Sequence, residues 1–245
     1  MNRIIPNNYA PKCPEMNGIP NSHGVFYGAC NFRCAFCGMA NRGDNGEDIS
    51  ENLRSLVSNG ANIKFSGGEP TLDPRLFKYL GLARDLGGVV FLDSNGSRPD
   101  VLKPLLDAEL VDVLGLSLKG ITPEEAETVS GVPRKLCWDN PIQSIGLGAE
   151  SKARTLVTLV FWVGHDTEAR LESFYALLRD FDVWYKINGL MPTGASKAHG
   201  LRPMQSDELE SAIQKWVERH TDLRGRVVYV PDKSAVRQYD KIKFY

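Results

Sequence analysis

The segment ACNFRCAFCGMA, residues 29–40, holds three of the five cysteines in this 245-residue chain. Cys30, Cys34 and Cys37 fall within eight positions, and the other two cysteines are isolated. Thiolates are soft ligands that favour zinc, copper(I) or iron–sulfur clusters. A structural zinc site needs four ligands, so three clustered thiols are one ligand short of a closed site. The question is what completes it.

Three interpretations of the clustered thiols are open at this point. A zinc site would have to borrow His23 or Cys13 as its fourth ligand. A reversible disulfide is the second, although the flanks do not resemble a C-x-x-C redox unit that opens a helix. An iron–sulfur cluster fits better, because four irons held by three cysteines leave one iron open to a substrate. Cys13 and Cys137 are then ordinary thiols.

The composition is that of an ordinary globular protein, with 42% hydrophobic and 24% charged residues. The 29 basic and 30 acidic side chains nearly balance, which gives no electrostatic reason to expect a nucleic acid or an anionic membrane as partner. No apolar run approaches a signal peptide or the roughly 18 residues of a membrane span. We therefore expect a cytoplasmic protein, in a compartment that keeps thiols reduced.

Apolar runs alternate with amphipathic helices from the cysteine segment almost to the C-terminus. Strands are expected within residues 23–29, 61–66, 88–96, 111–120, 154–164, 183–192 and 226–230. Helices are expected within 49–60, after 73, within 98–110, after 122, and within 167–181 and 206–220. Strands separated by helices indicate a parallel sheet with right-handed crossovers. Six or seven such units fall short of a full eight-stranded barrel, so one α/β domain with a partial barrel is predicted.

Two helix starts carry capping signals. Asp73 is a candidate N-cap with Pro74 in the first position, and the helix that follows is expected to bury Phe77. Thr122 and Glu125 have the spacing of a capping box.

Polar and glycine-rich segments follow the predicted strands. ACNFRC, SGGEP, DSNG and SLKG come after the first four strands, and GLMPTG comes after a later one. Ligands of parallel α/β sheets bind at the C-terminal ends of the strands. These segments therefore fall at one mouth of the predicted sheet.

The motifs together resemble those of a known family. The pattern Cys30-x3-Cys34-x2-Cys37, with Phe36 just before the last cysteine, is similar to the signature of radical S-adenosylmethionine (SAM) enzymes. FSGGEPTL at residues 65–72, followed by DSNG and SLKG at the expected strand ends, strengthens the resemblance.

The resemblance runs from about residue 23 to residue 192. It implies a single-domain partial (β/α)6 barrel of the radical SAM type with a parallel sheet. We place this barrel at residues 23–230, after a lead segment at 1–22 and before a C-terminal tail at 231–245.

The chemistry that the resemblance implies answers the opening question. The three cysteines would hold one [4Fe–4S] cluster per chain, and the amino and carboxylate groups of SAM would chelate the fourth iron. One electron passed into the sulfonium would break its C5′–S bond. The products would be methionine and a 5′-deoxyadenosyl radical that abstracts a hydrogen atom from a substrate. The protein would orient the reactants and exclude water.

The resemblance also implies a set of SAM contacts. Gly67 and Gly68 would let the backbone approach the methionine ammonium closely, and Glu69 would add a carboxylate. Phe36 would shield the cluster near the adenine.

Further contacts are implied at the next two strand ends. Asp93, Ser94 and Asn95 would lie near the ribose and methionine ends of SAM, and Lys119 could pair with its carboxylate. In the subset that activates glycyl radical enzymes, the matching Asp helps to hold a monovalent cation. That subset has a second Asp two residues before the Lys, where this chain has Ser117.

The length and the motifs most resemble the small activases of anaerobic ribonucleotide reductase and pyruvate formate-lyase. This implies a glycyl radical enzyme as partner and a flavodoxin- or ferredoxin-type electron donor. Activases commonly have His-Asn after the third cysteine, where this chain has Gly38 and Met39, and the region from 193 onward also departs. The alternatives are a stand-alone radical SAM enzyme acting on a peptide or small metabolite, and a non-catalytic zinc-binding protein.

Overall fold

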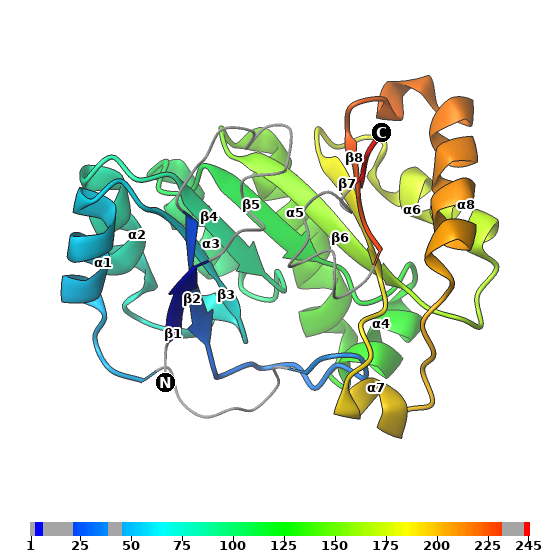
Figure 1. The fold of residues 1–245 in the computed structure, drawn as a ribbon, viewed down its shortest axis with the longest axis horizontal. Helices are drawn as coiled ribbons and strands as arrows, with labels where there is room; N and C mark the ends of the chain where they lie inside the picture. Colours follow the sequence, from blue (N-terminus) through cyan, green and yellow to red (C-terminus); the bar gives the residue numbers. More distant parts are fainter. Residues whose placement is uncertain (1–2, 7–21, 39–45, 232–242) are drawn as a thin grey trace.

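The computed structural model describes residues 3–6, 22–38, 46–231 and 243–245. Within these ranges the strands form one sheet in which they lie side by side in sequence order (Figure 1). They are β1 (Arg3–Pro6), β2 (Ser22–Tyr27), β3 (Asn62–Gly67), β4 (Val90–Ser94), β5 (Val113–Ser117), β6 (Arg154–Phe161), β7 (Trp184–Gly189), β8 (Val227–Val230) and β9 (Lys243–Phe244). The strands from β2 to β8 are parallel to their neighbours, and β1 and β9 pair antiparallel at the two edges.

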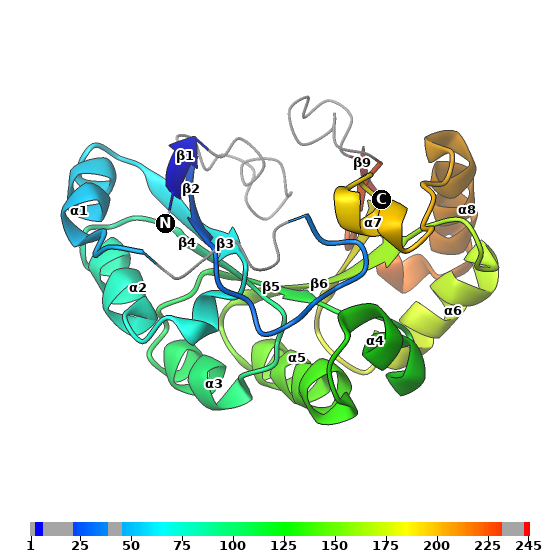
Figure 2. The same ribbon diagram turned by 90° about the horizontal axis from the view of Figure 1, so that it is seen from below.

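Helices connect each parallel strand to the next. They are α1 (Ser50–Ser58), α2 (Leu76–Asp85), α3 (Pro99–Asp107), α4 (Pro123–Ser130), α5 (Asn140–Glu150), α6 (Thr167–Leu178), α7 (Gly194–Ala198) and α8 (Ser206–Arg219). Figure 2 shows the sheet curved, with all of these helices except α7 on its outer side. No helix in the described ranges has both the length and the apolar character to cross a bilayer.

The curved sheet has a different kind of packing on each face. Its outer face meets the helices in a large apolar core that includes Phe65, Tyr185 and Trp216. Its inner face has a smaller apolar cluster, in which Phe91 pairs with Val113 across neighbouring strands. Side chains two residues apart on a strand point to the same face. Apolar side chains therefore fill the inner face near the starts of the strands. Polar side chains can occupy the inner face near the ends of the strands.

The predicted α/β partial barrel is confirmed, with additions at its edges. The expected strands and helices are all present, and the strand expected within 226–230 is β8, the seventh parallel strand in the described part of the chain. The edge strands β1 and β9 and the helices α5 and α7 were not expected. Both edge strands are only two to four residues long, too short for a periodic pattern to stand out.

The expected burial of Phe77 is wrong, since 51% of its surface is exposed. Helix α2 begins at Leu76 after an N-cap at Arg75, and the Asp73 carboxylate accepts from the Arg75 backbone at 2.9 Å before the helix starts. The buried face of α2 then repeats at Leu76, Tyr79, Leu80 and Ala83. A helical residue turns by roughly 100° per position, so Phe77 points away from this face.

The capping box at Thr122 forms by half. The Thr122 side chain accepts from the backbone N–H of Glu125 at 3.2 Å. The Glu125 carboxylate accepts from Ile121 at 2.8 Å, and it also pairs with Arg170 of helix α6 at 2.7 Å. Glu125, which was expected to complete the capping box, therefore links α4 to α6 through its ion pair with Arg170.

Two phenylalanines on outer helices give a matched test of this packing. Phe174 on α6 is fully buried against Tyr185, with ring centroids 5.3 Å apart. We expect Phe174→Ala to lower the free energy of unfolding by about 3–5 kcal/mol, because it leaves a cavity. Phe77→Ala should change it by about 0.5 kcal/mol or less. Urea unfolding followed by circular dichroism checks both, and equal losses would contradict the assigned faces.

Candidate functional site

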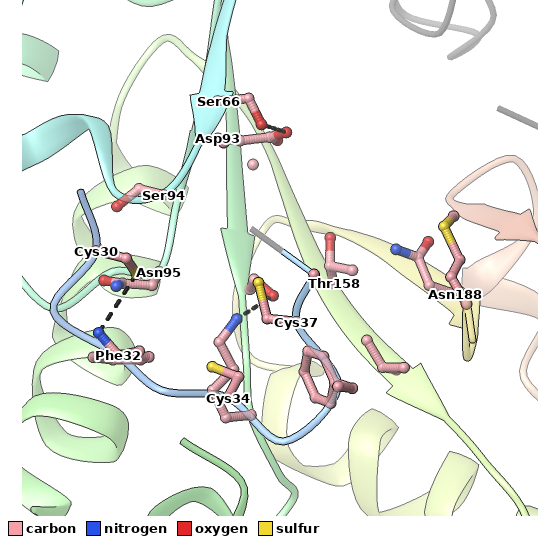
Figure 3. A pocket seen from close by; sticks show the side chains of 18 of the residues that line it. Cys30, Phe32, Cys34, Cys37, Ser66, Asp93, Ser94, Asn95, Thr158 and Asn188 are labelled. Carbon is pink, nitrogen blue, oxygen red and sulfur yellow. Dashed lines mark hydrogen bonds between the residues drawn. The ribbon is translucent and has the colours of Figure 1, made fainter. Parts of the chain in front are cut away.

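A cavity of about 330 Å³ opens at the C-terminal ends of the central strands (Figure 3). Cys30, Cys34 and Cys37 all line it. So do eight further residues that the sequence singles out, namely Phe36, Gly67, Gly68, Asp93, Ser94, Asn95, Ser117 and Lys119. Glu69 is absent from this lining. The strand ends thus bring together nearly all the residues expected at the site.

The cysteine segment is held against the end of helix α4. The backbone N–H of Arg33 donates to the carbonyl of Ser130, and that of Ala35 donates to Val129, both at 2.8 Å. These bonds use the carbonyls that a helix leaves unpaired at its C-terminus. Backbone hydrogen bonds therefore fix the path of the cysteine segment between the end of β2 and the end of α4. The side chains of the segment remain available to line the cavity.

No disulfide joins the cavity thiols within the described ranges. Burial raises the pKa of Cys30, and it raises that of Cys34 to about 11, although the nearby Lys119 ammonium opposes both shifts. The backbone N–H of Phe32 donates to Cys30 Sγ at 3.4 Å. Thiols bind metal as thiolates, so metal binding here must displace protons. Three soft sulfur donors on one cavity wall, one short of a closed set, fit an iron–sulfur cluster.

The zinc interpretation finds no support in the described residues. His23 lies near the start of β2, and the cysteines follow its other end at Tyr27. The four residues of strand from His23 to Tyr27 span roughly 13 Å. Cys13, the other ligand considered, lies outside the described residues. In the described ranges no three His, Cys, Asp or Glu side chains are grouped closely enough to hold a single ion.

The glycines after β3 allow two backbones to pass at close range. Gly67 has a φ of +107°, and a Cβ there would lie 2.7 Å from backbone atoms of Tyr27. A Cβ on Gly68 would overlap the carbonyl oxygen of Ala29. The N–H groups of Gly68 and Glu69 donate to Tyr27 (2.8 Å) and Ala29 (2.7 Å). These glycines thus join the β3 turn to the start of the cysteine segment.

Glu69 connects two strand ends from behind the cavity. Its side chain is fully buried and accepts hydrogen bonds from the hydroxyls of Thr71 (2.6 Å) and Ser94 (2.8 Å) and from the backbone N–H of Asn95 (2.6 Å). Burial raises the pKa of this carboxyl, although these donors oppose the shift. Glu69 therefore ties the turn after β3 to the turn after β4.

An amide network not found from the sequence anchors the cysteine segment from the other side. Asn31 accepts from Asn95 Nδ2 and donates to Ser97 Oγ, both at 2.8 Å. Asn140 at the start of α5 donates to the Ser97 carbonyl at 2.7 Å. Asn95 and Ser97 lie more than 60 residues from Asn31 in the chain. The only hint of this network in the sequence is that Asn31, an amide side chain, directly follows Cys30.

Asp93 is engaged in an ion pair inside the barrel. Its carboxylate lies 2.7 Å from Lys64 Nζ and accepts from Ser66 Oγ at 2.9 Å. Gly115 on β5 makes room for it, because a Cβ there would overlap Asp93 Oδ1. Burial opposes ionisation, but Lys64 and Lys186 outweigh it and hold the pKa of Asp93 below its usual value. The sequence did not indicate a role for either lysine.

The remaining expected residues form one wall beside the thiols. Lys119 is buried and donates to Ser117 Oγ at 2.6 Å. Its ammonium lies 5.8 Å from the centre of the Phe36 ring, which contacts Trp162 with centroids 6.1 Å apart. Thr193, before helix α7, donates to the Phe36 carbonyl at 3.3 Å. Thr193 also lines the cavity and was not predicted.

The close passage at Gly68 can be tested against a second glycine. Gly68→Ala should lower the free energy of unfolding by about 1–3 kcal/mol, because the new methyl pushes two hydrogen-bonded backbones apart. Gly81 lies in helix α2, where a Cβ would point into space that the described residues leave open for 4 Å. Gly81→Ala should leave stability unchanged or raise it by about 0.5–1 kcal/mol. Denaturant unfolding measures both, and a tolerated Gly68→Ala would contradict the contact.

Comparison with known proteins places this site in a family. Residues 25–178, more than half of the chain, match the radical SAM superfamily. A Methanocaldococcus jannaschii protein that bears the name of a glycyl-radical enzyme activating enzyme is 29% identical over 102 residues, 39% of this chain and 42% of that protein. An S-adenosylmethionine-dependent nucleotide dehydratase from Pseudoalteromonas ulvae is 28% identical over 149 residues, 51% of this chain and 48% of that protein. The chain thus spans about half the length of these relatives, or less.

Among solved structures, Streptococcus suis SuiB bound to S-adenosylmethionine superposes with a TM-score of 0.71 at 17% identity, over 88% of this chain and 51% of SuiB. At that identity the likeness concerns the fold alone. The sequence match covers the cysteine segment and the ends of β3 to β6 that line the cavity, whereas the lining residues of β7 and of the loop after it lie beyond the match. The chain belongs to the radical SAM superfamily.

Proposed function

We propose that Cys30, Cys34 and Cys37 hold the [4Fe–4S] cluster that membership of the superfamily implies, and that SAM is the remaining ligand. The observation that carries this proposal is that the three thiols line one cavity together with residues of the five strands from β3 to β7. When bound and reduced, the cluster supplies the electron that cleaves SAM to methionine and a 5′-deoxyadenosyl radical. The protein's own residues bind, orient and shield these groups.

The geometry divides the expected contacts into two groups. Phe36, Gly67, Gly68, Ser94, Asn95, Ser117 and Lys119 line the cavity, and we assign them to the wall that SAM contacts. The buried Lys119 ammonium suits a carboxylate. We assign supporting roles to Glu69, which is buried behind the turn, and to Asp93, whose carboxylate is paired with Lys64.

Removing one thiol tests the cluster assignment. After anaerobic reconstitution, Cys34→Ala should lose most of its bound iron and sulfide, and it should release no 5′-deoxyadenosine from SAM with dithionite. Cys137 is the matched control, because it is a buried thiol on the π-helical turn Lys135–Asp139 that packs in the same apolar cluster as Cys34 but does not line the cavity. Cys137→Ala should keep both properties. A Cys34→Ala protein with unchanged iron content and product release would refute the assignment.

The target of the radical has two candidates, and the cavity favours a small anionic molecule. Lys64 and Lys186 face one carboxylate, Asp93, on the inner face of the sheet. Among the described residues, the lysines Lys119 and Lys186 and one acid, Asp93, line the cavity, and ammonium groups attract an anionic substrate more strongly than an uncharged glycine loop. The similarity to a nucleotide dehydratase agrees with a substrate of this kind.

The second candidate is a glycine of a partner glycyl radical enzyme. It is supported by the sequence motifs and by the similarity to the M. jannaschii protein. In either case a flavodoxin- or ferredoxin-type protein would deliver the electron.

A product assay separates these targets. Reconstituted protein with SAM and dithionite is supplied with nucleoside triphosphates or with a peptide that carries a glycine-radical loop. We expect an anionic metabolite to raise 5′-deoxyadenosine release several-fold and the peptide to leave it at background. Stimulation by the peptide, with a glycyl radical in the electron paramagnetic resonance spectrum, would instead establish the activase.

A further inference from the structure

Helix α6 buries an arginine that the proposed chemistry does not use. Arg170 is only 2% exposed, and its Nη1 lies 2.7 Å from Oε1 of Glu125, in the first turn of α4. Taking a guanidinium out of water costs free energy that one ion pair recovers only in part. Replacing a buried ion pair by apolar side chains of similar volume is often neutral or stabilising. A buried arginine at this position therefore calls for a reason other than stability.

The guanidinium of Arg170 lies over two aromatic rings at the end of β6. Its central carbon is 5.0 Å from the centre of the Trp162 ring and 5.4 Å from that of Phe161. Arg170 Nε and Nη2 are buried and have no hydrogen-bond partner among the residues that the structure describes. A planar guanidinium is attracted to the face of an aromatic ring, most strongly to that of tryptophan. Arg170 thus joins the rings after β6 to the carboxylate on α4.

Trp162 connects this arginine to the cavity. Its ring is not part of the cavity lining in the described ranges, but it contacts the ring of Phe36, which is, with centroids 6.1 Å apart. Trp162 and Phe36 pack in one apolar cluster with Val129 and Leu190. The His165 ring meets Trp162 edge-on, with centroids 4.6 Å apart. The tryptophan is therefore held between the arginine, this histidine and the cysteine segment.

We propose that Arg170 is a positioning residue for the cofactor wall, and that it fixes the ring of Phe36 through Trp162. The inference rests on the proposed function, in which Phe36 belongs to the wall that SAM contacts. Phe36 directly precedes Cys37, so a displaced ring would also uncover that thiol. Arg170 does not line the cavity among the described residues, and it acts only through its neighbours.

The competing interpretation is structural, with Arg170 serving only to join α6 to α4 through Glu125. In that case Arg170→Lys, which keeps the charge, would behave as the natural protein does, and changes at Trp162 would not reproduce those at Arg170. The positioning role requires the planar group. Variants of Arg170 and of Trp162 should therefore share one effect at the cysteine segment.

Alkylation of the cluster-free protein with iodoacetamide, followed for each thiol by mass spectrometry, provides the first test. We expect Arg170→Met and Trp162→Ala each to speed the labelling of Cys37 several-fold, because the ring of Phe36 loses its support. Trp162→Phe keeps a ring in contact and should label at the natural rate. Arg170→Lys keeps the charge without the plane and should label as fast as Arg170→Met.

Two controls separate this effect from general loosening. Arg179→Met removes an exposed arginine at the end of α6 and should label at the natural rate. The fully buried thiol of Cys137 should stay slow in every variant. The proposal is overturned if Arg170→Met leaves Cys37 at the natural rate, if Arg170→Lys restores that rate, or if Cys137 labels faster in parallel. Trp162→Ala carries the test if Arg170→Met does not fold.

The second measurement uses the reconstituted protein with SAM and dithionite. Arg170→Met should keep its iron content and its kcat for 5′-deoxyadenosine release, and it should raise the KM for SAM about tenfold, since it changes the wall and not the cluster ligands. An unchanged KM, or a loss of iron in this variant, would overturn the proposal. A natural protein that releases no 5′-deoxyadenosine would refute the proposed function and leave the labelling result standing.

Discussion

The close passage of the β3 turn along the cysteine segment is the constraint on which the site depends. Two consecutive backbone N–H groups, at Gly68 and Glu69, donate to carbonyls of the neighbouring segment, at a separation that no side chain on Gly68 would permit. The Glu69 carboxylate then continues the connection to the turn after β4, where it accepts from Ser94 and Asn95. Three strand ends are thereby fixed relative to one another before any ligand is present. Preorganisation of this kind lowers the cost of ordering groups on binding.

The two faces of the sheet differ in packing, and this difference explains how the fold tolerates polar side chains on the inner face. Stability comes mainly from the outer face, where helices bury aromatic and aliphatic side chains. The inner face contributes a smaller cluster around Trp184, which seals the strand starts. The strand ends are then left to carry ion pairs and thiols. Lys64 illustrates the arrangement, because its ammonium pairs with Asp93 and also lies 4.1 Å from the centre of the Phe91 ring.

Much of the fold followed from the sequence, because strongly apolar strands and one-sided helices leave a periodic signal. The prediction of which helix face is buried depends on where the helix begins, and it was wrong at Phe77. Helix α2 begins at Leu76, and the Asp73 carboxylate accepts from the Arg75 backbone before that start. The motif residues were found, but their tertiary roles were not. Glu69 reads as a carboxylate available to a ligand, yet its neighbours in space satisfy it. Asn31 and Lys186 could not be placed, since their surroundings are formed by residues distant in the chain.

The hydrogen bond from Thr193 to the Phe36 carbonyl has a mechanical consequence. Thr193 stands five residues beyond Asn188, so a single short tether runs from the end of β7 to the loop that bears the thiols. The tether is stiff, because Thr193 also caps helix α7 through a reciprocal pair of bonds with Ser196. The β7 side of the barrel mouth and the cysteine segment are therefore held to each other at this point by a side-chain hydrogen bond.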